Sequence, residues 1–364
     1  MRLSEIIRVL EQHAPLSLQE SYDNSGLQVG DPKMDINGAL ITTDVTPEVL
    51  DEAIRLGFNL IISHHPLIFG GIKSLTGRTV TEQLVIHAIR NEIAIYSGHT
   101  NFDAVFNGVS LKICDKLGLI NNQILEPVKG SLKKLVVFVP LSHAGEVREA
   151  LFRGGAGVIG NYDSCSFNLE GTGTFRGGEN TDPFVGEKGK LHREAEVRIE
   201  TVIPAHLAGS AVEAMKLVHP YEEVAYDLYP LENDYPLAGM GMLGELPDEM
   251  DELMFLQFLK DRFSAGCIRH TALLGKKVRK VAVCGGAGSF LLKKAIAARA
   301  DVFITGDMKY HGFFDAVGRI LLADIGHYES EQFTQELFYE LIIKNFPKFA
   351  VRLSEINTNP IKYF

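Results

Sequence analysis

The sequence contains few cysteines, and none of them are close together. Four are present among 364 residues, without a C-x-x-C pair. Small secreted proteins that depend on disulfide bonds carry far more cysteine at short spacing, so this class is excluded. We expect free, buried thiols in a reducing compartment at the four positions, which are Cys114, Cys165, Cys267 and Cys284.

Long apolar runs and basic runs are also missing. No apolar stretch reaches the roughly 18 residues of a membrane-spanning helix. Residues 1–15 carry Arg, Glu and His inside their apolar pattern, which is atypical of a signal peptide. Acidic residues outnumber basic ones by 46 to 36, giving a formal charge of −10, whereas general nucleic-acid binding needs stripes of Lys and Arg. We therefore expect a soluble cytoplasmic protein with neither a membrane nor a nucleic-acid partner.

The composition is that of an ordinary globular protein, with 46% hydrophobic and 23% charged residues. At about 150 residues per domain, the length predicts two or three domains. Ala39–Val45 is apolar and rich in β-branched residues, which predicts a strand. Thr46-Pro47 is typical of a helix start and Gly57 of a helix end, and Asn59–Ser63 predicts a second strand. This βαβ order predicts a parallel sheet with a right-handed crossover.

The same alternation continues at both ends of the chain. Ser4 is a candidate N-cap of a first helix, and the glycine-rich segment 23–31 reads as a loop. Helices are expected at Val80–Arg90, Val109–Leu117, Phe290–Ala298 and Ser330–Lys344. Strands are expected at Ile93–Ser97, Val278–Cys284, Asp301–Thr305, Arg319–Ile325 and Phe349–Leu353.

The middle of the chain follows a different order. Predicted strands at Leu135–Val139, Tyr162–Leu169, Glu196–Ile203 and Val224–Tyr229 alternate with helices at Ala144–Arg153 and Ala208–Val218. The order β-α-β-β-α-β is that of the ferredoxin-like fold, and residues 171–190 read as a long exposed loop or hairpin. The predicted fold class is α/β, with a discontinuous two-lobed α/β core formed by residues 1–130 and 246–364 and an inserted ferredoxin-like α+β module at 131–245.

Histidines and carboxylates follow several predicted strands of the core. His64 and His65 come directly after NLIIS, Asp103 lies shortly after the next strand, and His327 and Glu331 follow RILLADIG. Ligands of open α/β sheets bind at the carboxyl ends of strands. Each pattern alone has an ordinary structural explanation, namely a surface loop, a helix cap or an exposed helix face. Their convergence at strand ends favours a metal site.

Three imidazoles and two carboxylates suit zinc, manganese, iron or cobalt better than a soft copper site. Five ligands exceed what one open catalytic zinc requires, and they fit two neighbouring divalent ions, for which zinc is favoured. Pro66 keeps the preceding residue extended, so His64 and His65 can splay toward different ions.

The motifs DNSGLQVGD, SHHP, GHTNFD, ITGD-x-x-x-H and D-x-GHYESE occur in this order. Together they resemble the Nif-three-like dinuclear metal proteins, often labelled GTP cyclohydrolase 1 type 2 homologues. The resemblance covers both outer segments and assigns metal binding to His64, His65, Asp103, His327 and Glu331. It implies a homohexamer with metal sites facing an internal cavity. The middle module resembles the insertion of long bacterial members, which is similar to trimeric signalling and metal-tolerance proteins.

Other side chains near the predicted strand ends have two interpretations. His99 and Asp307 are candidate catalytic residues for proton transfer, although a structural His and a helix cap explain them as well. His311 is a candidate pocket residue, and Asp23 and Asp44 can orient a ligating histidine.

Two further motifs remain open. CGGAGS at 284–289 follows a strand and can hold an anion through its N–H groups, but a tight structural turn explains its glycines better. HPYEEVAYD at 219–227 offers His, Tyr and Glu side chains for a second ligand site, and an ordinary loop into a strand accounts for it equally well.

These observations lead to two hypotheses of different classes. The first is a metal-dependent hydrolase for a small, nucleotide-like substrate, for which the family label suggests ring opening of GTP; a phosphoesterase is an equally physical use of two ions. The second is a metal-binding regulatory or metal-handling protein without turnover, which the inserted module favours.

Overall fold

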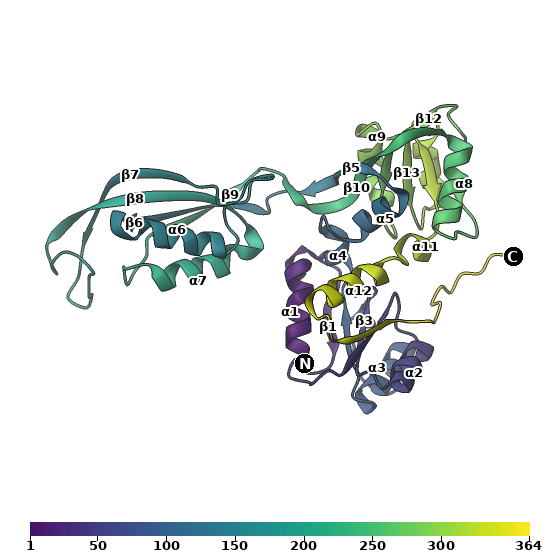
Figure 1. Ribbon diagram of the computed structural model, residues 1–364, viewed down its shortest axis with the longest axis horizontal. Coiled ribbons are helices and arrows are strands. Elements are labelled where there is room, and N and C mark those ends of the chain that lie inside the picture. The colour runs from purple at the N-terminus through teal and green to yellow at the C-terminus, as the bar shows by residue number, and fades with distance from the viewer. The chain divides into compact units, whose positions relative to one another are not determined.

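The computed structural model describes residues 1–364, which divide into two compact units. The first unit combines Met1–Pro127 with Leu237–Phe364, and the second is the inserted stretch Val128–Pro236 (Figure 1). Residue 245, the predicted end of the insertion, lies inside β10 (Tyr235–Asp251), which is one continuous strand. None of the helices combines the length and the apolar character needed to cross a membrane.

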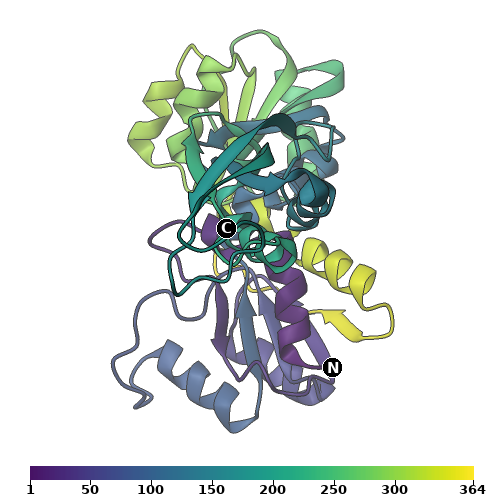
Figure 2. The same ribbon diagram turned by 90° about the vertical axis from the view of Figure 1, so that its left-hand side faces the viewer.

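The first sheet of the discontinuous unit has the order β1-β4-β3-β2-β15. Its strands β2, β3, β4 and β15 are mutually parallel, and β1 is antiparallel to β4. The strand bounds are Gly26–Val29 for β1, Gly38–Thr42 for β2, Leu60–Ser63 for β3, Ala94–Ser97 for β4 and Ala350–Leu353 for β15. Helices α1 (Leu3–His13) and α12 (Thr334–Asn345) cover one face and lie side by side (Figures 1 and 2). Helices α2 (Pro47–Leu56) and α3 (Val80–Arg90) cover the other face.

The predicted βαβ unit is confirmed. Thr46 caps α2 by accepting a hydrogen bond from the Val49 N–H, Pro47 is its first residue, and Gly57 ends it in the left-handed conformation. Strands β2 and β3 are parallel and fully buried. Alternate residues of each strand pack toward opposite helix layers, so both faces of the strands must be apolar.

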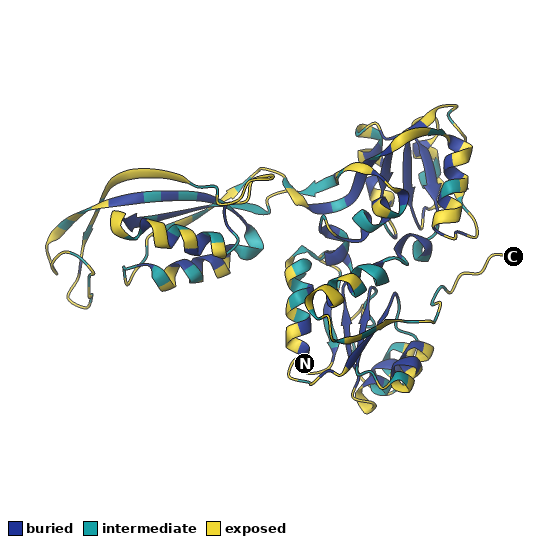
Figure 3. Cartoon of the chain, in the orientation of Figure 1, coloured by how far each residue is buried: buried dark blue, intermediate teal, exposed yellow.

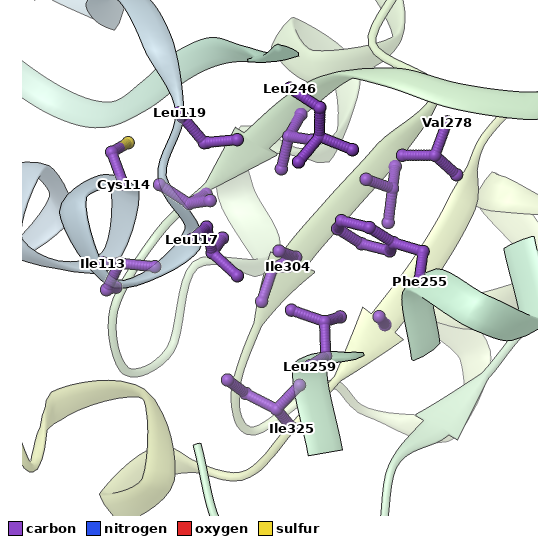
Figure 4. Packing of buried hydrophobic residues seen from close by; sticks show 14 of the residues in the cluster. Ile113, Cys114, Leu117, Leu119, Leu246, Phe255, Leu259, Val278, Ile304 and Ile325 are labelled. Atoms are coloured by element: carbon purple, nitrogen blue, oxygen red, sulfur yellow. The ribbon is translucent and has the colours of Figure 1, made fainter. Parts of the chain in front are cut away.

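The second sheet of the same unit has the order β11-β14-β13-β12-β10-β5, with parallel β12, β13 and β14 at its centre. The bounds are Ile120–Val128 for β5, Arg269–His270 for β11, Lys277–Val283 for β12, Val302–Thr305 for β13 and Leu321–Asp324 for β14. Helices α5 (Val109–Leu117) and α8 (Glu252–Arg262) pack on one face, where they enclose the apolar cluster of Figure 4. Helices α9 (Leu292–Ala297) and α10 (Tyr310–Ala316) pack on the other. Buried residues therefore concentrate on the central strands (Figure 3).

Ile304 lies at the centre of this cluster, on β13, and is 1% exposed. Replacing it with valine deletes one buried methylene group. We expect the free energy of unfolding to fall by about 0.5–1.5 kcal/mol, measured by chemical denaturation. The same change at Ile89, an exposed position of α3, is the matched control and should leave stability within about 0.5 kcal/mol. Equal effects at both positions would contradict this account of the core.

The inserted unit is a four-stranded antiparallel sheet with the order β7-β8-β6-β9. The strands are β6 (Leu132–Pro140), β7 (Phe167–Arg176), β8 (Leu191–Pro204) and β9 (Tyr226–Leu231). Helices α6 (Ala144–Arg153) and α7 (Ala208–Val218) pack against each other on one face (Figure 1). Their connection and strand order confirm the predicted ferredoxin-like arrangement.

Several local predictions were wrong. Arg2, not Ser4, is the N-cap of α1. The segment 23–31 contains β1, because its backbone pairs with β4. The third strand of the chain's middle begins at Leu191, earlier than the predicted Glu196, and β7 ends at Arg176, later than the predicted Leu169; residues 171–190 therefore form part of a hairpin, one of the two predicted alternatives. The helix expected from Ser330 is two helices, α11 (His327–Glu331) and α12. All four cysteines are free, but only Cys114 and Cys284 are buried; Cys165 is half-buried and Cys267 is exposed.

Candidate metal centre

Both sheets of the discontinuous unit contribute residues to one cluster. His64 and His65 follow β3, and Asp103 lies on α4 (Thr100–Ala104), directly after β4. His327 and Glu331 are the first and last residues of α11, which follows β14. The structure thus brings all five predicted ligands together, at the carboxyl ends of parallel strands. These histidine and carboxylate groups can hold a metal ion.

His65, His327 and Glu331 form the first group. Glu331 Oε2 lies 3.0 Å from both His65 Nε2 and His327 Nε2, and the two nitrogens are 3.2 Å apart. Ligands of a tetrahedral ion at 2.0–2.1 Å are separated by about 3.3–3.4 Å. The triangle of donor atoms is therefore close to the size that one ion requires.

The outer nitrogens of these two imidazoles are already used. His65 Nδ1–H donates to Asp44 at 2.7 Å, and His327 Nδ1–H donates to Asp307 at 2.8 Å. Because each ring carries its proton on Nδ1, the Nε2 lone pairs of His65 and His327 face each other and the Glu331 carboxylate. Such an arrangement is repulsive unless a proton or a metal cation lies between the donors.

His64, Asp103 and Glu331 form the second group. His64 Nε2 lies 3.6 Å from Glu331 Oε1 and 3.9 Å from Asp103 Oδ1. His64 Nδ1–H donates to the carbonyl of Gly98, which leaves Nε2 as a free donor atom for a ligand. Both His64 Nε2 and Asp103 Oδ1 are buried without a hydrogen-bond partner. Buried polar atoms are normally satisfied, so these two orphaned atoms fit a cation held between them and Glu331.

The carboxylates of the cluster favour a positive charge between the donor atoms, as the pKa shifts of its residues show. Burial opposes the charged form of His65, but the hydrogen bonds that its ring donates to Asp44 and Glu331 outweigh burial and raise its pKa to about 10. Burial likewise opposes charge on His327, yet Glu331 and Asp307 raise its pKa to about 9. Burial and then repulsion from Glu331 raise the pKa of Asp103 to about 7. The histidines overcome the cost of burying Glu331 and lower its pKa.

Metal binding should therefore compete with protons. Because the pKa values of His65 and His327 are raised, protons compete near neutral pH for the imidazole nitrogens that an ion must take. Raising the pH removes the competitor, so we expect the affinity for Zn²⁺ to rise by roughly one to two powers of ten per pH unit between about pH 6 and 8. Chelator-competition titrations measure this slope, and calorimetry in buffers of different ionisation enthalpy counts the released protons. A pH-independent affinity would contradict the arrangement.

A glycine makes room for the shared carboxylate. Gly286 has a φ of +57°, and a Cβ at this position would lie 2.2 Å from Glu331 Oε1. Its N–H donates to Ser330 Oγ, and the Gly288 N–H donates to Thr305 Oγ1. The CGGAGS segment thus spends these two N–H groups within the protein, as a tight structural turn does, and it sets the distance between β12 and α11.

His99 lies beside the two groups. Its Nδ1–H donates to Asp23 Oδ1 at 2.7 Å, and its ligand nitrogen lies within 4.8 Å of those of His64 and His65. Asp23 also accepts hydrogen bonds from the Thr100 N–H and hydroxyl. Burial raises the pKa of Asp23, but the hydrogen bonds from His99 and Thr100 outweigh burial and lower this pKa below its usual value. Asp23 therefore orients His99, while Asp44 orients His65.

Two other candidate residues, Asp307 and His311, lie outside the cavity at the metal centre. Asp307 contacts the outer nitrogen of His327 and does not line the cavity described below. It is not the cap of α10, whose N-cap is Lys309. Its position is that of an orienting residue, not of a proton carrier inside the cavity. His311 is exposed, its ring lies edge-on to that of Tyr310, and it does not line the cavity either.

A cavity of about 570 Å³ opens onto the cluster, lined among others by His65, His99, Asp103, His327 and Glu331. Its wall includes the aromatic side chains of Tyr22, Phe69 and Phe290, which the sequence did not single out, and Cys284. Tyr22 and Phe69 lie 6.4 Å apart between ring centroids. Tyr22 adjoins Asp23 in the chain, and Cys284 and Phe290 flank the glycine turn. Proximity to those motifs is the signal that could have identified them.

Comparison with known proteins gives a consistent result over the whole chain. Residues 1–360 match the family described as Duf34/NIF3 (NGG1p interacting factor 3). A protein of Halalkalibacterium halodurans, named GTP cyclohydrolase 1 type 2 homolog, is 39% identical over 98% of each chain. A protein of the same name from Bacillus subtilis is 37% identical over 99% of this chain and 98% of its own. The crystal structure of a Bacillus cereus protein related to NIF3 is 41% identical, covers 100% of this chain and 99% of its own, and superimposes with a TM-score of 0.87.

Proposed function

The chain belongs to the Duf34/NIF3 family, and from this membership and the geometry of its site we propose that it is a dinuclear metal-dependent hydrolase for a nucleotide-like substrate. The observation that carries the proposal is the shared use of Glu331. Its Oε2 belongs to the group with His65 and His327, and its Oε1 faces His64 beside Asp103. A carboxylate common to two ligand groups is the expected bridge of a two-ion site.

The donor set favours zinc, and manganese, iron or cobalt are compatible with it. When bound, two such ions supply Lewis acidity to water and to the substrate. The surrounding residues fix the donors: Asp44, Asp307 and the Gly98 carbonyl each hold one imidazole in the tautomer that leaves Nε2 free. Orientation of this kind strengthens metal binding and sets ring geometry.

Proton transfer is assigned to His99. The hydrogen bond to Asp23 fixes Nδ1–H, so Nε2 is the atom that takes up or releases a proton in the cavity. A positioned imidazole of this kind typically contributes about 10²–10⁴-fold to a rate.

The substrate class follows from the cavity wall. Tyr22, Phe69 and Phe290 offer aromatic faces on which a planar base can stack, an interaction worth about 1–3 kcal/mol per base. The name of the relatives points to GTP. In that reaction one water adds at C8, a C8–N bond breaks, and a second water releases C8 as formate.

The charge of the cavity constrains a triphosphate substrate. Apart from imidazoles, the charged lining residues are Glu20, Asp103 and Glu331, which repel phosphate groups. Binding of GTP should therefore depend on metal loading. A phosphoesterase acting on a less charged substrate is the alternative use of the same two-ion site.

The test compares metal-loaded protein with GTP and with a panel of phosphoesters, alongside His65→Ala. His311→Ala is the matched control, because His311 is exposed and outside the cavity. Turnover that is lost in His65→Ala and kept in His311→Ala supports a hydrolase. Tightly bound metal without any turnover would overturn it and leave the regulatory or metal-handling alternative.

A further inference from the structure

The inserted unit contains a cavity of its own, separate from the metal centre. Its volume is about 380 Å³, within the range of small-molecule sites. The wall is formed by β6, the end of β7, the segment after it, β8 and the HPYEE motif, and it includes Phe175, Arg176, Phe184, Glu196 and Tyr221. The HPYEE motif, for which the sequence allowed either a ligand site or an ordinary loop, therefore lines a cavity.

A buried carboxylate lies at this cavity. Glu196 is 9% exposed, and its Oε1 accepts a hydrogen bond from the Tyr221 hydroxyl at 2.8 Å. It forms no ion pair, and Oε2 receives no hydrogen bond from the protein. Gly173 leaves the space for this oxygen, since a Cβ there would lie 2.1 Å from it. Carboxylates that are largely buried are normally paired with a cation, so the unpaired oxygen of Glu196 makes this cavity a favourable place for a positively charged group.

The histidine of the motif is not available as a metal ligand. His219 Nε2–H donates to the Phe138 carbonyl at 3.0 Å, and Nδ1 accepts from the Tyr221 N–H at 3.1 Å. Burial lowers the pKa of His219, which agrees with a neutral ring whose two nitrogens are both engaged. A structural role explains this histidine, and Glu196 alone is a poor site for a metal ion.

Aromatic rings surround the carboxylate. The Tyr221 ring lies 6.0 Å from Phe175 and 6.4 Å from Phe184 between centroids, with both pairs inclined at 50–58°. Inclined rings beside an anionic group form a cage for an organic cation, because ring faces attract positive charge and accept alkyl groups. We propose that this cavity binds a small organic ammonium ion, with Glu196 as counter-ion and the rings of Tyr221, Phe175 and Phe184 around its alkyl groups.

The charges at the rim agree with this ligand. Glu222 and Glu223 add two carboxylates, against one guanidinium from Arg176. Glu222 Oε1 accepts a hydrogen bond from the Asp182 N–H at 2.9 Å, which ties the segment carrying Phe184 to the HPYEE motif. The wall contributed by Phe184 is thereby fixed to the one contributed by Tyr221.

The experiment measures binding of choline to the full chain by titration calorimetry, with 3,3-dimethylbutan-1-ol as an uncharged probe of the same shape. We expect saturable choline binding and at least a tenfold weaker affinity for the alcohol. Glu196→Gln keeps the size of the side chain and should also weaken choline binding about tenfold or more. Glu200→Gln is the matched control, because Glu200 lies on the same strand and already pairs with Arg198 and Lys134. The affinity of this variant for choline should equal that of the unchanged protein.

A second variant keeps the proposal testable if Glu196→Gln unfolds. Phe184→Leu changes an exposed ring, leaves Glu196 in place, and should weaken choline binding several-fold. Metal content at the other site should stay unchanged in all variants. Absence of saturable binding up to about 10 mM choline, equal binding of the alcohol, or binding unaffected by both variants would overturn the proposal.

Discussion

Replacing Glu331 with glutamine should remove metal from both ligand groups at once. Glu331 is 3% exposed, and its two oxygens face three imidazoles at 3.0–3.6 Å. An amide of the same size carries no negative charge and presents an NH₂ group where a lone pair is needed. Loss of an orienting neighbour alone costs about 10–100-fold in affinity, so loss of the shared ligand should exceed about a hundredfold. Elemental analysis after chelator-free purification measures the result.

The control is Glu329→Gln, on the same short helix. Glu329 is buried as well, but its Oε1 accepts from Asn359 Nδ2 and takes no part in the ligand groups. This variant should keep the metal content of the unchanged protein. Replacing Asp103, in contrast, should empty only the group with His64. A full complement of two ions in Glu331→Gln would contradict the bridging role and the two-ion proposal with it.

Local sequence signals predicted correctly those helices whose ends depend on neighbouring residues. The cap at Thr46, the proline after it and the left-handed Gly57 predicted α2 correctly, and α3, α5 and α7 begin and end at the predicted residues. The α/β class and the ferredoxin-like insertion followed from element order alone. His327 and Glu331 are four residues apart, a spacing that places two side chains on the same face of a helix, and α11 begins at His327.

Predictions failed where a distant partner determines the outcome. Gly26–Val29 is a strand only because β4 supplies hydrogen bonds along its edge, and no periodicity within four residues reveals this. Asp307 follows β13, which ends at Thr305. Its carboxylate lies against Nδ1 of His327, where it orients the ring, and it does not line the cavity. The aromatic wall combines Tyr22, Phe69 and Phe290 from segments far apart in the sequence. Spacing along a chain carries no information about such encounters until the sheet order is known.

Replacing His99 with glutamine should separate proton transfer from metal binding. The imidazole lines the cavity, and Asp23 fixes its Nδ1–H at 2.7 Å. Glutamine retains polarity and approximate length but cannot take up a proton near neutral pH. If the chain is the proposed hydrolase, we expect kcat for its substrate to fall about 10²–10⁴-fold while the metal content stays unchanged. Steady-state kinetics and metal content are measured on the same samples.

The pH dependence distinguishes a proton carrier from a structural residue. If His99 transfers protons, the dependence of kcat on pH should differ between His99→Gln and the unchanged protein, and added imidazole should restore part of kcat in His99→Ala. His87→Gln is the matched control, since His87 lies on α3 away from the cavity, and it should leave both rate and profile unchanged. Unchanged kcat in His99→Gln would refute the assignment. Loss of one ion in that variant would instead make His99 a ligand in the group that it forms with His64 and His65.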